Sequence, residues 1–289
     1  MTTMLLELAD VRFRYPDGSV GLDACSLAIE RGSRNALVGA NGSGKTTLFQ
    51  HANGLLRPQA GTVRYAGEAL DYSRGGLREL RSKVGLVFQN PDHQLFSASV
   101  QEDVSFGPIN LGLDEATVRR RVSDALASVG MLDCANKAVH NLSFGQKKRV
   151  CIAGVLAMEP ELLILDEPMA GLDHAMRVEL TAVLDGLQAR GITLLLATHD
   201  IDFAYRWADR IHVMIAGRCS ASLSCDELED HHNALSEAGL PLPTVMTLHR
   251  QMVAQGVLPQ MTMPRSHAEL LDQLATREDQ HRKQETPCH

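Results

Sequence analysis

The sequence predicts an α/β domain with a mixed β-sheet, an antiparallel N-terminal part, an internal helical subdomain and a small C-terminal extension. Short apolar runs such as "VGLVF", "LLILD" and "ITLLLAT" alternate with helical patterns, which indicates the mixed sheet. In "LLELADVRFRY" apolar and polar residues alternate before the turn "YPDG", which indicates the antiparallel part. A chain of 289 residues can bury the core of such a domain and carry an appendage.

Strands dominate the first part of the chain. The apolar run "NALVG" ends in a glycine-rich loop, and that loop opens a helix near Lys45. The strands expected in this part are residues 5–15, 20–29, 35–39, 61–67 and 84–88.

Helical patterns separate the later strands. Asp114 precedes one such pattern and is the expected N-cap of a helix that runs to about residue 129. Arg119, Arg120 and Arg121 should lie on or near the solvated face of this helix. The remaining elements expected in this part are helices near 145–157 and 174–190 and strands at 162–166 and 192–198.

These elements set the expected domain boundaries. The main domain should span residues 4–223, with its helical subdomain at about 92–157. The C-terminal extension should span 224–275 and is a candidate dimerisation element, in which one helix is expected after the proline-containing segment "AGLPLPTVMTL". The polar residues 276–289 are expected to be a disordered tail.

Composition restricts the partners. The formal net charge is −7, which disfavours nucleic acid as a partner. The six cysteines are scattered and form no Cys-x-x-Cys pair, so reduced intracellular thiols are expected. We find neither a signal-peptide pattern nor an apolar run long enough to span a bilayer. We therefore expect a cytoplasmic chain that does not insert into a membrane and acts on one only through partners.

The strongest motif is "GANGSGKTT", which fits the pattern G-x-x-x-x-G-K-[ST] between a predicted strand and a predicted helix. The glycines let successive backbone N–H groups face one phosphate chain, and the helix N-terminus adds partial positive charge. Lys45 is expected to reach the β- and γ-phosphates, and the Thr46 hydroxyl to ligate Mg²⁺. The candidate nucleotide-binding residues are Gly39, Asn41, Gly42, Ser43, Gly44, Lys45, Thr46 and Thr47.

A second motif, "LLILDEP", places two acids at the end of an apolar strand. Phosphates lie at the carboxyl edge of such a sheet. Asp166 is therefore the candidate magnesium residue, and Glu167 the candidate general base or water-orienting residue.

A third motif, "LSFGQ", heads a predicted helix and exposes Ser143 and the Gly145 amide at its N-terminus. The chain thus carries two phosphate-binding helix ends, one more than a single nucleotide needs. With this motif the sequence resembles the ABC-transporter ATPases, a P-loop family, over roughly residues 4–220. The resemblance implies a head-to-tail dimer with two ATP molecules, in which the signature motif of one subunit completes the site of the other.

Further residues are carried over by the resemblance. "AGLD" and "ATHD" resemble the D-loop and the switch-histidine segment, so His199 should contact the γ-phosphate. Tyr15 matches the aromatic residue that stacks on adenine, although a plain strand aromatic is the alternative. The residues that should act across the dimer are Ser143, Phe144, Gly145, Gln146 and Asp173.

Two positions depart from the commonest family pattern. Phe144 stands where the signature usually has glycine, and Ala170-Gly171 stands where the D-loop is often Ser-Ala. Neither change removes a catalytic side chain, so a homodimer could have two working sites. A heterodimer with a sister ATPase is the alternative.

The segment "VFQNPDHQLFSASVQEDVSFGPINLGL" narrows the resemblance to energy-coupling-factor ATPases, especially those of cobalt and nickel importers. It implies that Gln89 reaches magnesium and the attacking water, and that Leu95 and Phe96 anchor a helix of a transmembrane coupling protein. A separate membrane protein would bind the substrate, and the ATPase would lie on the cytoplasmic face of the cell membrane. His93 occupies the variable position of the motif and is not expected to bind metal.

The function expected from the sequence is therefore hydrolysis of ATP to ADP and phosphate, with Mg²⁺, to power cobalt uptake. Nickel or a vitamin as cargo is the alternative within the class. A soluble, non-transport ABC ATPase is the alternative from another class. Lys45 and Leu142 lie too close in the sequence for a repair-type coiled-coil insertion, and the chain has room for one ATPase domain only.

Overall fold

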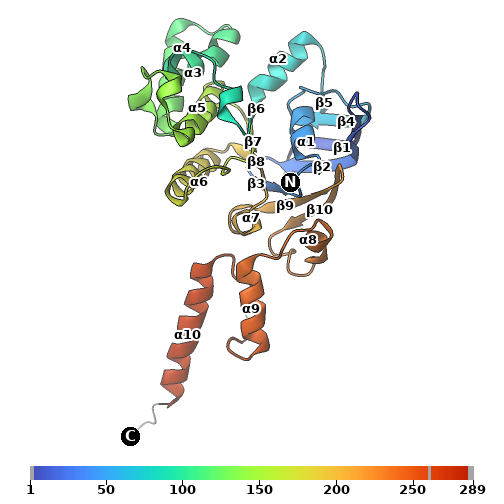
Figure 1. The fold of residues 1–289 in the computed structure, drawn as a ribbon, viewed down its shortest axis with the longest axis vertical. Helices are drawn as coiled ribbons and strands as arrows, with labels where there is room; N and C mark the ends of the chain where they lie inside the picture. Colours follow the sequence, from blue (N-terminus) through green and yellow to red (C-terminus); the bar gives the residue numbers. More distant parts are fainter. Residues whose placement is uncertain (1–2, 260–261, 286–289) are drawn as a thin grey trace.

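The protein contains two β-sheets (Figure 1). The structure is a computed structural model that describes residues 3–259 and 262–285, with side chains to residue 276. The first sheet is antiparallel and has the order β2-β1-β4-β5. Its strands are β1 (Met4–Arg14), β2 (Val20–Glu30), β4 (Ala60–Tyr65) and β5 (Glu68–Ala69). This sheet is the antiparallel part that the N-terminal alternation predicted.

The second sheet is mixed and has the order β10-β9-β3-β8-β7-β6. All neighbouring strands are parallel except β9 and β10, which form an antiparallel hairpin at one edge. The strands are β3 (Arg34–Val38), β6 (Val84–Val87), β7 (Leu162–Asp166), β8 (Thr193–Thr198), β9 (Arg210–Ile215) and β10 (Arg218–Ser224).

The central strands are mainly apolar because both faces of this sheet are covered. On β7, Leu162 and Ile164 face the antiparallel sheet together with Leu48 and Phe49 of α1 (Lys45–Ala52). Leu163 and Leu165 face the opposite layer of helices. The period of two along the strand thus divides the core into two clusters.

Helices form that opposite layer. They include α5 (Phe144–Leu156), α6 (His174–Ala189) and α7 (Ile201–Trp207). The helical subdomain is made of α3 (Val100–Asn110), α4 (Glu115–Ser128) and the beginning of α5, which lie together at one end of the molecule (Figure 1). Asp114 caps α4 as predicted, because its carboxylate accepts a bond from the Thr117 N–H.

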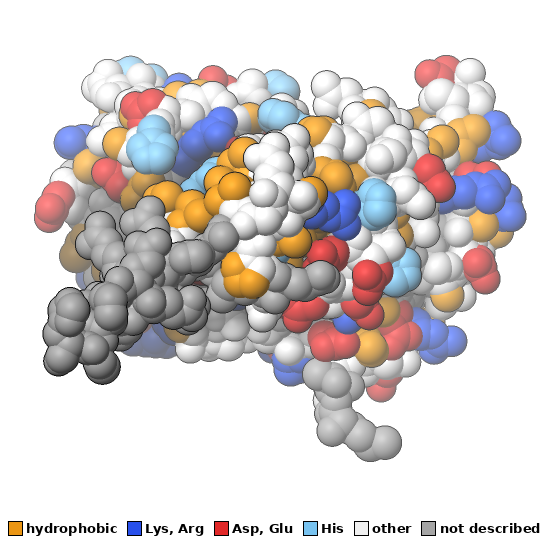
Figure 2. All heavy atoms as spheres, turned by 90° about the horizontal axis from the view of Figure 1, so that it is seen from below, with side chains coloured by type: hydrophobic (Ala, Val, Ile, Leu, Met, Phe, Trp, Pro, Cys, Tyr) orange, Lys and Arg blue, Asp and Glu red, His pale blue; other side chains and the backbone are white. Residues whose placement is uncertain are grey.

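The C-terminal extension contains α8 (Asn233–Glu237), α9 (Thr244–Ala254) and α10 (His267–Glu285). α9 and α10 project away from the helical subdomain, and Figure 2 shows this end with hydrophobic side chains among charged ones (Figures 1 and 2). The Thr244 N–H and hydroxyl donate to the two carboxylate oxygens of Asp202, which attaches the extension to α7.

The structure corrects several expectations. Two helices, not one, occupy the part of the extension that begins at "PTVMTL". The second of them, α10, continues to Glu285, where a disordered tail was expected from residue 276. Its last part is rich in Glu, Gln, Arg and Lys, which favour helix. Residues 286–289 of that expected tail lie outside the described residues. Arg121 is mostly buried and pairs with Glu159, whereas Arg119 and Arg120 are exposed.

Several elements of the described residues were not expected from the sequence, among them α2 (Arg74–Lys83), α7, β9 and β10. Within the described residues, no helix is both long enough and apolar enough to cross a bilayer.

Candidate active site

The carboxyl ends of β3, β7 and β8 meet at one edge of the mixed sheet, and the candidate site lies there. The glycine-rich loop follows β3, the two acids end β7, and His199 follows β8. Residues far apart in the sequence are thereby brought to one place.

Glycine is required at both ends of the phosphate loop. A Cβ atom on Gly39 would lie 2.4 Å from the Met214 carbonyl oxygen, and one on Gly44 would lie 2.6 Å from the Gly21 carbonyl oxygen. Both glycines also have positive φ angles, 155° and 105°, which side chains disfavour. The loop therefore packs so closely against its neighbours that neither position has room for a side chain.

Lys45 begins α1 and bends back over the loop, where its Nζ donates to the carbonyls of Gly39 at 2.7 Å and Ala40 at 3.1 Å. Burial lowers the pKa of this ammonium, while the carboxylates of Glu167 and Asp166 oppose that shift. The Ser43 hydroxyl is buried and has no hydrogen-bond partner among the described residues. A buried donor of this kind suits an anion such as a phosphate.

A cleft of about 550 Å³ lies beside this loop. Tyr15 stands at one side, and its hydroxyl is 2.9 Å from the Thr47 Oγ1. The cleft brings together most of the predicted nucleotide-binding and catalytic residues. Its lining residues are Tyr15, Ser19, Val20, Gly21, Asn41, Gly42, Gly44, Lys45, Thr46, Thr47, Gln89, Asp166, Glu167 and His199.

The structure pairs Asp166 with Thr46, whose hydroxyl donates to the Asp166 Oδ2 at 2.7 Å. Burial raises the pKa of the Asp166 carboxyl, whereas the Thr46 hydrogen bond and the Lys45 charge lower it. A hydroxyl, a carboxylate and the nearby amide of Gln89 supply hard oxygen donors, which is the donor set that Mg²⁺ prefers. The residues present therefore fit a magnesium ion.

Glu167 and His199 form the second pair, with His199 Nδ1 3.0 Å from Glu167 Oε2. The backbone of Glu167 is left-handed, with φ at 47°, which is unfavourable for a residue with a side chain. Asp166 and Glu167 are thus adjacent in the sequence but have different partners.

The signature residues lie at the N-terminus of α5 and do not line this cleft. Ser143 and Gln146 form a capping box, in which each side chain accepts a hydrogen bond from the backbone N–H of the other. Asp173 caps α6 by accepting a bond from the Met176 N–H at 2.8 Å. One chain therefore places Ser143, Phe144, Gly145, Gln146 and Asp173 outside its own cleft, as a role in a second subunit would require.

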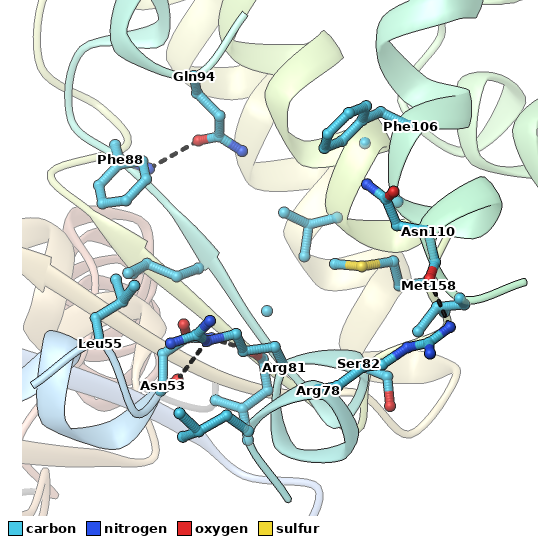
Figure 3. Close-up of a pocket in the computed structure, with 18 of the residues that line it drawn as sticks. Asn53, Leu55, Arg78, Arg81, Ser82, Phe88, Gln94, Phe106, Asn110 and Met158 are labelled. Atoms are coloured by element: carbon cyan, nitrogen blue, oxygen red, sulfur yellow. Dashed lines mark hydrogen bonds between the residues drawn. The ribbon is translucent and has the colours of Figure 1, made fainter. Parts of the chain in front are cut away.

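A separate groove of about 700 Å³ lies between α2 and the helical subdomain (Figure 3). Apolar side chains such as Leu55, Phe106 and Met158 line it. Arg78 donates to the Asn110 carbonyl at 2.6 Å, and Arg81 donates to the Gly54 carbonyl at 3.0 Å, so both arginines are held along its rim. The Gln94 side chain accepts a bond from the Phe88 N–H at 3.0 Å.

The two predicted partner contacts behave differently. Phe96 is 66% exposed, lines the groove and packs edge-on against Phe106. Leu95 instead packs, partly buried, against the hydrophobic core and is not among the groove-lining residues, so its role as a partner contact stays a prediction. Asp103 fixes this arrangement, because its carboxylate accepts bonds from the N–H groups of Phe96 and Ser97, both at 2.9 Å.

Sequence reasoning missed the wall of the groove that α2 supplies, including Arg74, Arg78 and Arg81. Ser73, which caps α2, followed by apolar Leu77 and Leu80 at a helical spacing, was the available signal. His93 is exposed at the end of a short 3₁₀ turn. Within the described residues, no cluster of three or more His, Cys, Asp and Glu side chains suits a metal ion.

Comparison with known proteins identifies the family of this chain. The model of the ABC transporter family matches residues 22–170. The energy-coupling factor transporter ATP-binding protein EcfA of Methanothermobacter thermautotrophicus is 44% identical over 92% of this chain and 86% of its own length. The cobalt import ATP-binding protein CbiO of Rhodobacter capsulatus is 43% identical over 94% of this chain and 98% of its own length.

Solved structures agree with these relatives. The structure of cbiO1 from Clostridium perfringens, part of the ABC transporter complex cbiONQ, has a TM-score of 0.74 and 43% identity, covering 86% of this chain and 99% of that chain. A dimeric ATP-binding cassette bound to ADP and Pi has a TM-score of 0.70 and 27% identity, covering 76% of this chain and 99% of that chain.

The chain therefore belongs to the ABC transporter family. Within this family it is an ATP-hydrolysing subunit of the energy-coupling-factor type, the group that includes the EcfA and CbiO proteins.

Proposed function

We propose that this chain hydrolyses ATP to ADP and phosphate in order to power cobalt uptake through membrane partner proteins. The observation that carries this proposal is the segment between β6 and α3, which reaches both the cleft and the groove. Gln89 lines the nucleotide cleft, whereas Phe88, Gln94 and Phe96 line the groove. A change at the nucleotide can therefore bias the position of a partner in the groove.

The phosphate loop binds and orients the nucleotide. Its N–H groups and the N-terminus of α1 attract the phosphate oxygens, and Lys45 exchanges its carbonyl partners for the β- and γ-phosphates. Tyr15 lies at the side of the cleft, where its ring can stack on the adenine. Thr46, Asp166 and Gln89 would hold Mg²⁺, which would supply positive charge beside the phosphates.

Hydrolysis is assigned to Glu167 and His199. A water molecule attacks the γ-phosphorus, the bond from this phosphorus to the β–γ bridging oxygen breaks, and ADP is the leaving group. The Glu167 carboxylate orients this water and accepts its proton. His199 holds the Glu167 Oε2 at 3.0 Å and thereby fixes the base in line with the water.

A second copy of the chain completes each site in this proposal. Supporting it, the N-terminus of α5 is a preformed anion-binding end that lies outside its own cleft. The dimeric cassette among the similar structures supports the same arrangement. The residues proposed to act across the dimer are Ser143, Phe144, Gly145, Gln146 and Asp173.

The groove is proposed to receive a helix of the transmembrane coupling protein, with Phe96 as an apolar contact. A separate membrane protein binds the cargo, and the chain lies on the cytoplasmic face of the membrane through these partners. Cobalt is favoured because the name of the CbiO relative gives cobalt import, and this relative matches nearly the full length of the chain.

Reconstitution tests this proposal. The tagged chain is isolated from membranes with its co-purifying membrane proteins, the complex is reconstituted into liposomes, and uptake of radioactive Co²⁺ is measured with and without ATP. ATP-dependent Co²⁺ uptake that is lost in a complex with Glu167→Gln is expected. Uptake of Ni²⁺ or of a vitamin in place of Co²⁺ would contradict cobalt as the cargo. If no membrane protein co-purified with the chain, the transport role would be contradicted.

A further inference from the structure

Lys148 is a buried charge that the proposed mechanism does not use. It lies on α5, two residues after the signature motif, and is only 4% exposed. Its Nζ donates to three backbone carbonyls: those of Glu167 at 3.1 Å, Pro168 at 2.8 Å and Ala170 at 2.7 Å. An ammonium has three N–H donors, so the contacts with this one turn satisfy all of them.

The turn that Lys148 contacts is the one that aims the candidate general base. Glu167 has a left-handed backbone, which is unfavourable and persists only where the surroundings enforce it. The turn leaves several carbonyls pointing in one direction, and a buried ammonium is a strong partner for them. Burial lowers the pKa of Lys148 to about 8, and the nearby Glu167 carboxylate opposes this shift.

The two departures from the common family pattern meet at the same place. The Lys148 Nζ lies 5.2 Å from the centre of the Phe144 ring, one turn earlier on α5. A Cβ atom on Gly171 would lie 2.9 Å from the Phe144 Cε1, and Gly171 has a positive φ of 75°. The aromatic ring of the signature therefore packs against the D-loop at a glycine, where a side chain would crowd it.

We propose that Lys148 is a positioning residue for hydrolysis, which holds the strained turn at Glu167 from the signature helix. Phe144 and Gly171 extend these contacts. They connect the N-terminus of α5, which faces the nucleotide of the partner subunit in the proposed dimer, to the turn that orients Glu167 in the chain's own site. The effect of Lys148 on Glu167 does not depend on the dimer, whereas the connection to the partner's nucleotide rests on it.

Lys148→Met tests the role, because methionine has a similar length and no donor. We expect kcat for ATP to fall on the order of tenfold to a hundredfold, since a misplaced catalytic group costs that much. The dissociation constant for ATP should stay unchanged, because the phosphate loop is not touched. Lys148→Gln keeps two N–H donors and should recover part of the lost kcat.

Lys147→Met is the matched control. Lys147 is the neighbouring residue on α5, and its Nζ pairs with Asp92 at 2.7 Å, away from the turn at Glu167. The same substitution at this position should leave kcat and KM at wild-type values. All variants are checked by thermal unfolding, and if Lys148→Met does not fold, the comparison is made with Lys148→Gln.

A double-mutant cycle separates positioning from general stabilisation. If Lys148 acts through the Glu167 carboxylate, Lys148→Met should not lower the residual single-turnover rate of Glu167→Gln any further. A full additional loss in that background would overturn the proposal, and so would a wild-type kcat in Lys148→Met. Both measurements use ATP turnover by the purified chain, so their outcome is independent of the cargo.

Discussion

Two neighbouring acids at the end of β7 have different surroundings. Asp166 is buried and accepts a bond from Thr46, while Glu167 turns through a left-handed backbone toward His199. The first environment suits a residue that holds a metal ion, and the second suits a base that must reach a water molecule. The motif "LLILDEP" predicted both roles, but it did not reveal the strained turn that separates them.

Glu167→Gln isolates the role of the second acid. The amide keeps the shape of the side chain and cannot accept a proton, so ATP turnover should fall by about a hundredfold or more. ATP binding, measured by calorimetry or fluorescence, should remain, because the phosphate loop is unchanged. Steady-state turnover near the wild-type rate would remove Glu167 from the mechanism.

His212 provides a second test at this scale, because it is fully buried on β9 between two polar partners. Its Nε2 lies 3.1 Å from the Asn35 Oδ1, and its Nδ1 lies 2.8 Å from the Ser222 Oγ. The Asn35 side-chain nitrogen donates to the Leu194 carbonyl, so its oxygen must accept from His212 Nε2–H. Burial favours the neutral ring and lowers the pKa of His212 to about 3.

This pKa makes stability depend on pH. The folded ring resists protonation until about pH 3, whereas the unfolded ring takes up a proton below about pH 6.5. Stability from this group is thus present above pH 6.5 and is lost as the pH falls. Between pH 7 and pH 5 the free energy of unfolding should fall by about 2 kcal/mol from His212 alone.

Urea unfolding at both pH values measures the effect. In His212→Gln the fall between pH 7 and pH 5 should be smaller than in the wild type by this amount, whatever the absolute stability of the variant. Equal falls in the two proteins would show that His212 is not held neutral.

At the scale of elements, neighbouring side chains of the segment from Phe88 to Ser99 have different surroundings. Phe96 faces the groove and Leu95 faces the core, because Asp103 fixes the backbone between them. The sequence predicted both residues as partner contacts. It could not indicate that the two side chains point in different directions, because an irregular loop has no periodicity from which the direction of a side chain can be predicted.

The two positions should therefore respond differently to charge. Phe96→Glu should prevent co-purification of the transmembrane partner and change the free energy of unfolding by less than about 1 kcal/mol, because the site is exposed. Leu95→Glu should lower the free energy of unfolding by about 2 kcal/mol or more, because it places a charge against the core.

Leu132→Glu is the control for surface charge, since Leu132 is 47% exposed and lies outside the groove. It should leave both co-purification and stability near wild-type values. Normal co-purification of the partner with Phe96→Glu would contradict the groove as the docking site.

Other elements differ in how much the sequence could reveal. The buried strands β3, β7 and β8 were predictable because wholly apolar runs precede phosphate-binding or acidic motifs. α2 has only two apolar residues, Leu77 and Leu80, among charged and small ones, so its pattern was weak. β9, the first strand of the C-terminal hairpin, has the mainly apolar sequence "RIHVMI", and four consecutive residues of it are buried. This run indicated a strand, but it was overlooked.

At the scale of the molecule, the C-terminal extension is tied to the ATPase domain by long-range polar contacts. Arg265, just before α10, donates to the Tyr205 and Ala208 carbonyls at the end of α7. Thr244, at the start of α9, donates to Asp202 near the start of α7. These contacts join residues far apart in the sequence, so neither composition nor periodicity could predict where the extension attaches.

The general plan of the molecule was predictable, because the motifs occur in a fixed order and each has a fixed place in a parallel sheet. That the nucleotide site is shared between two subunits could be predicted only from the resemblance to the ABC-transporter ATPases. In the structure, the phosphate loop, the acids and His199 share a cleft, and the signature residues lie outside it. The central claim is that a second copy supplies the missing part.

A crystal structure of Glu167→Gln with ATP and Mg²⁺ tests this claim most directly. We expect a dimer with two ATP molecules, each bound by the phosphate loop of one protomer and by Ser143 and the Gly145 N–H of its partner. A structure in which each ATP is fully bound, with its γ-phosphate contacted by a single chain, would contradict it.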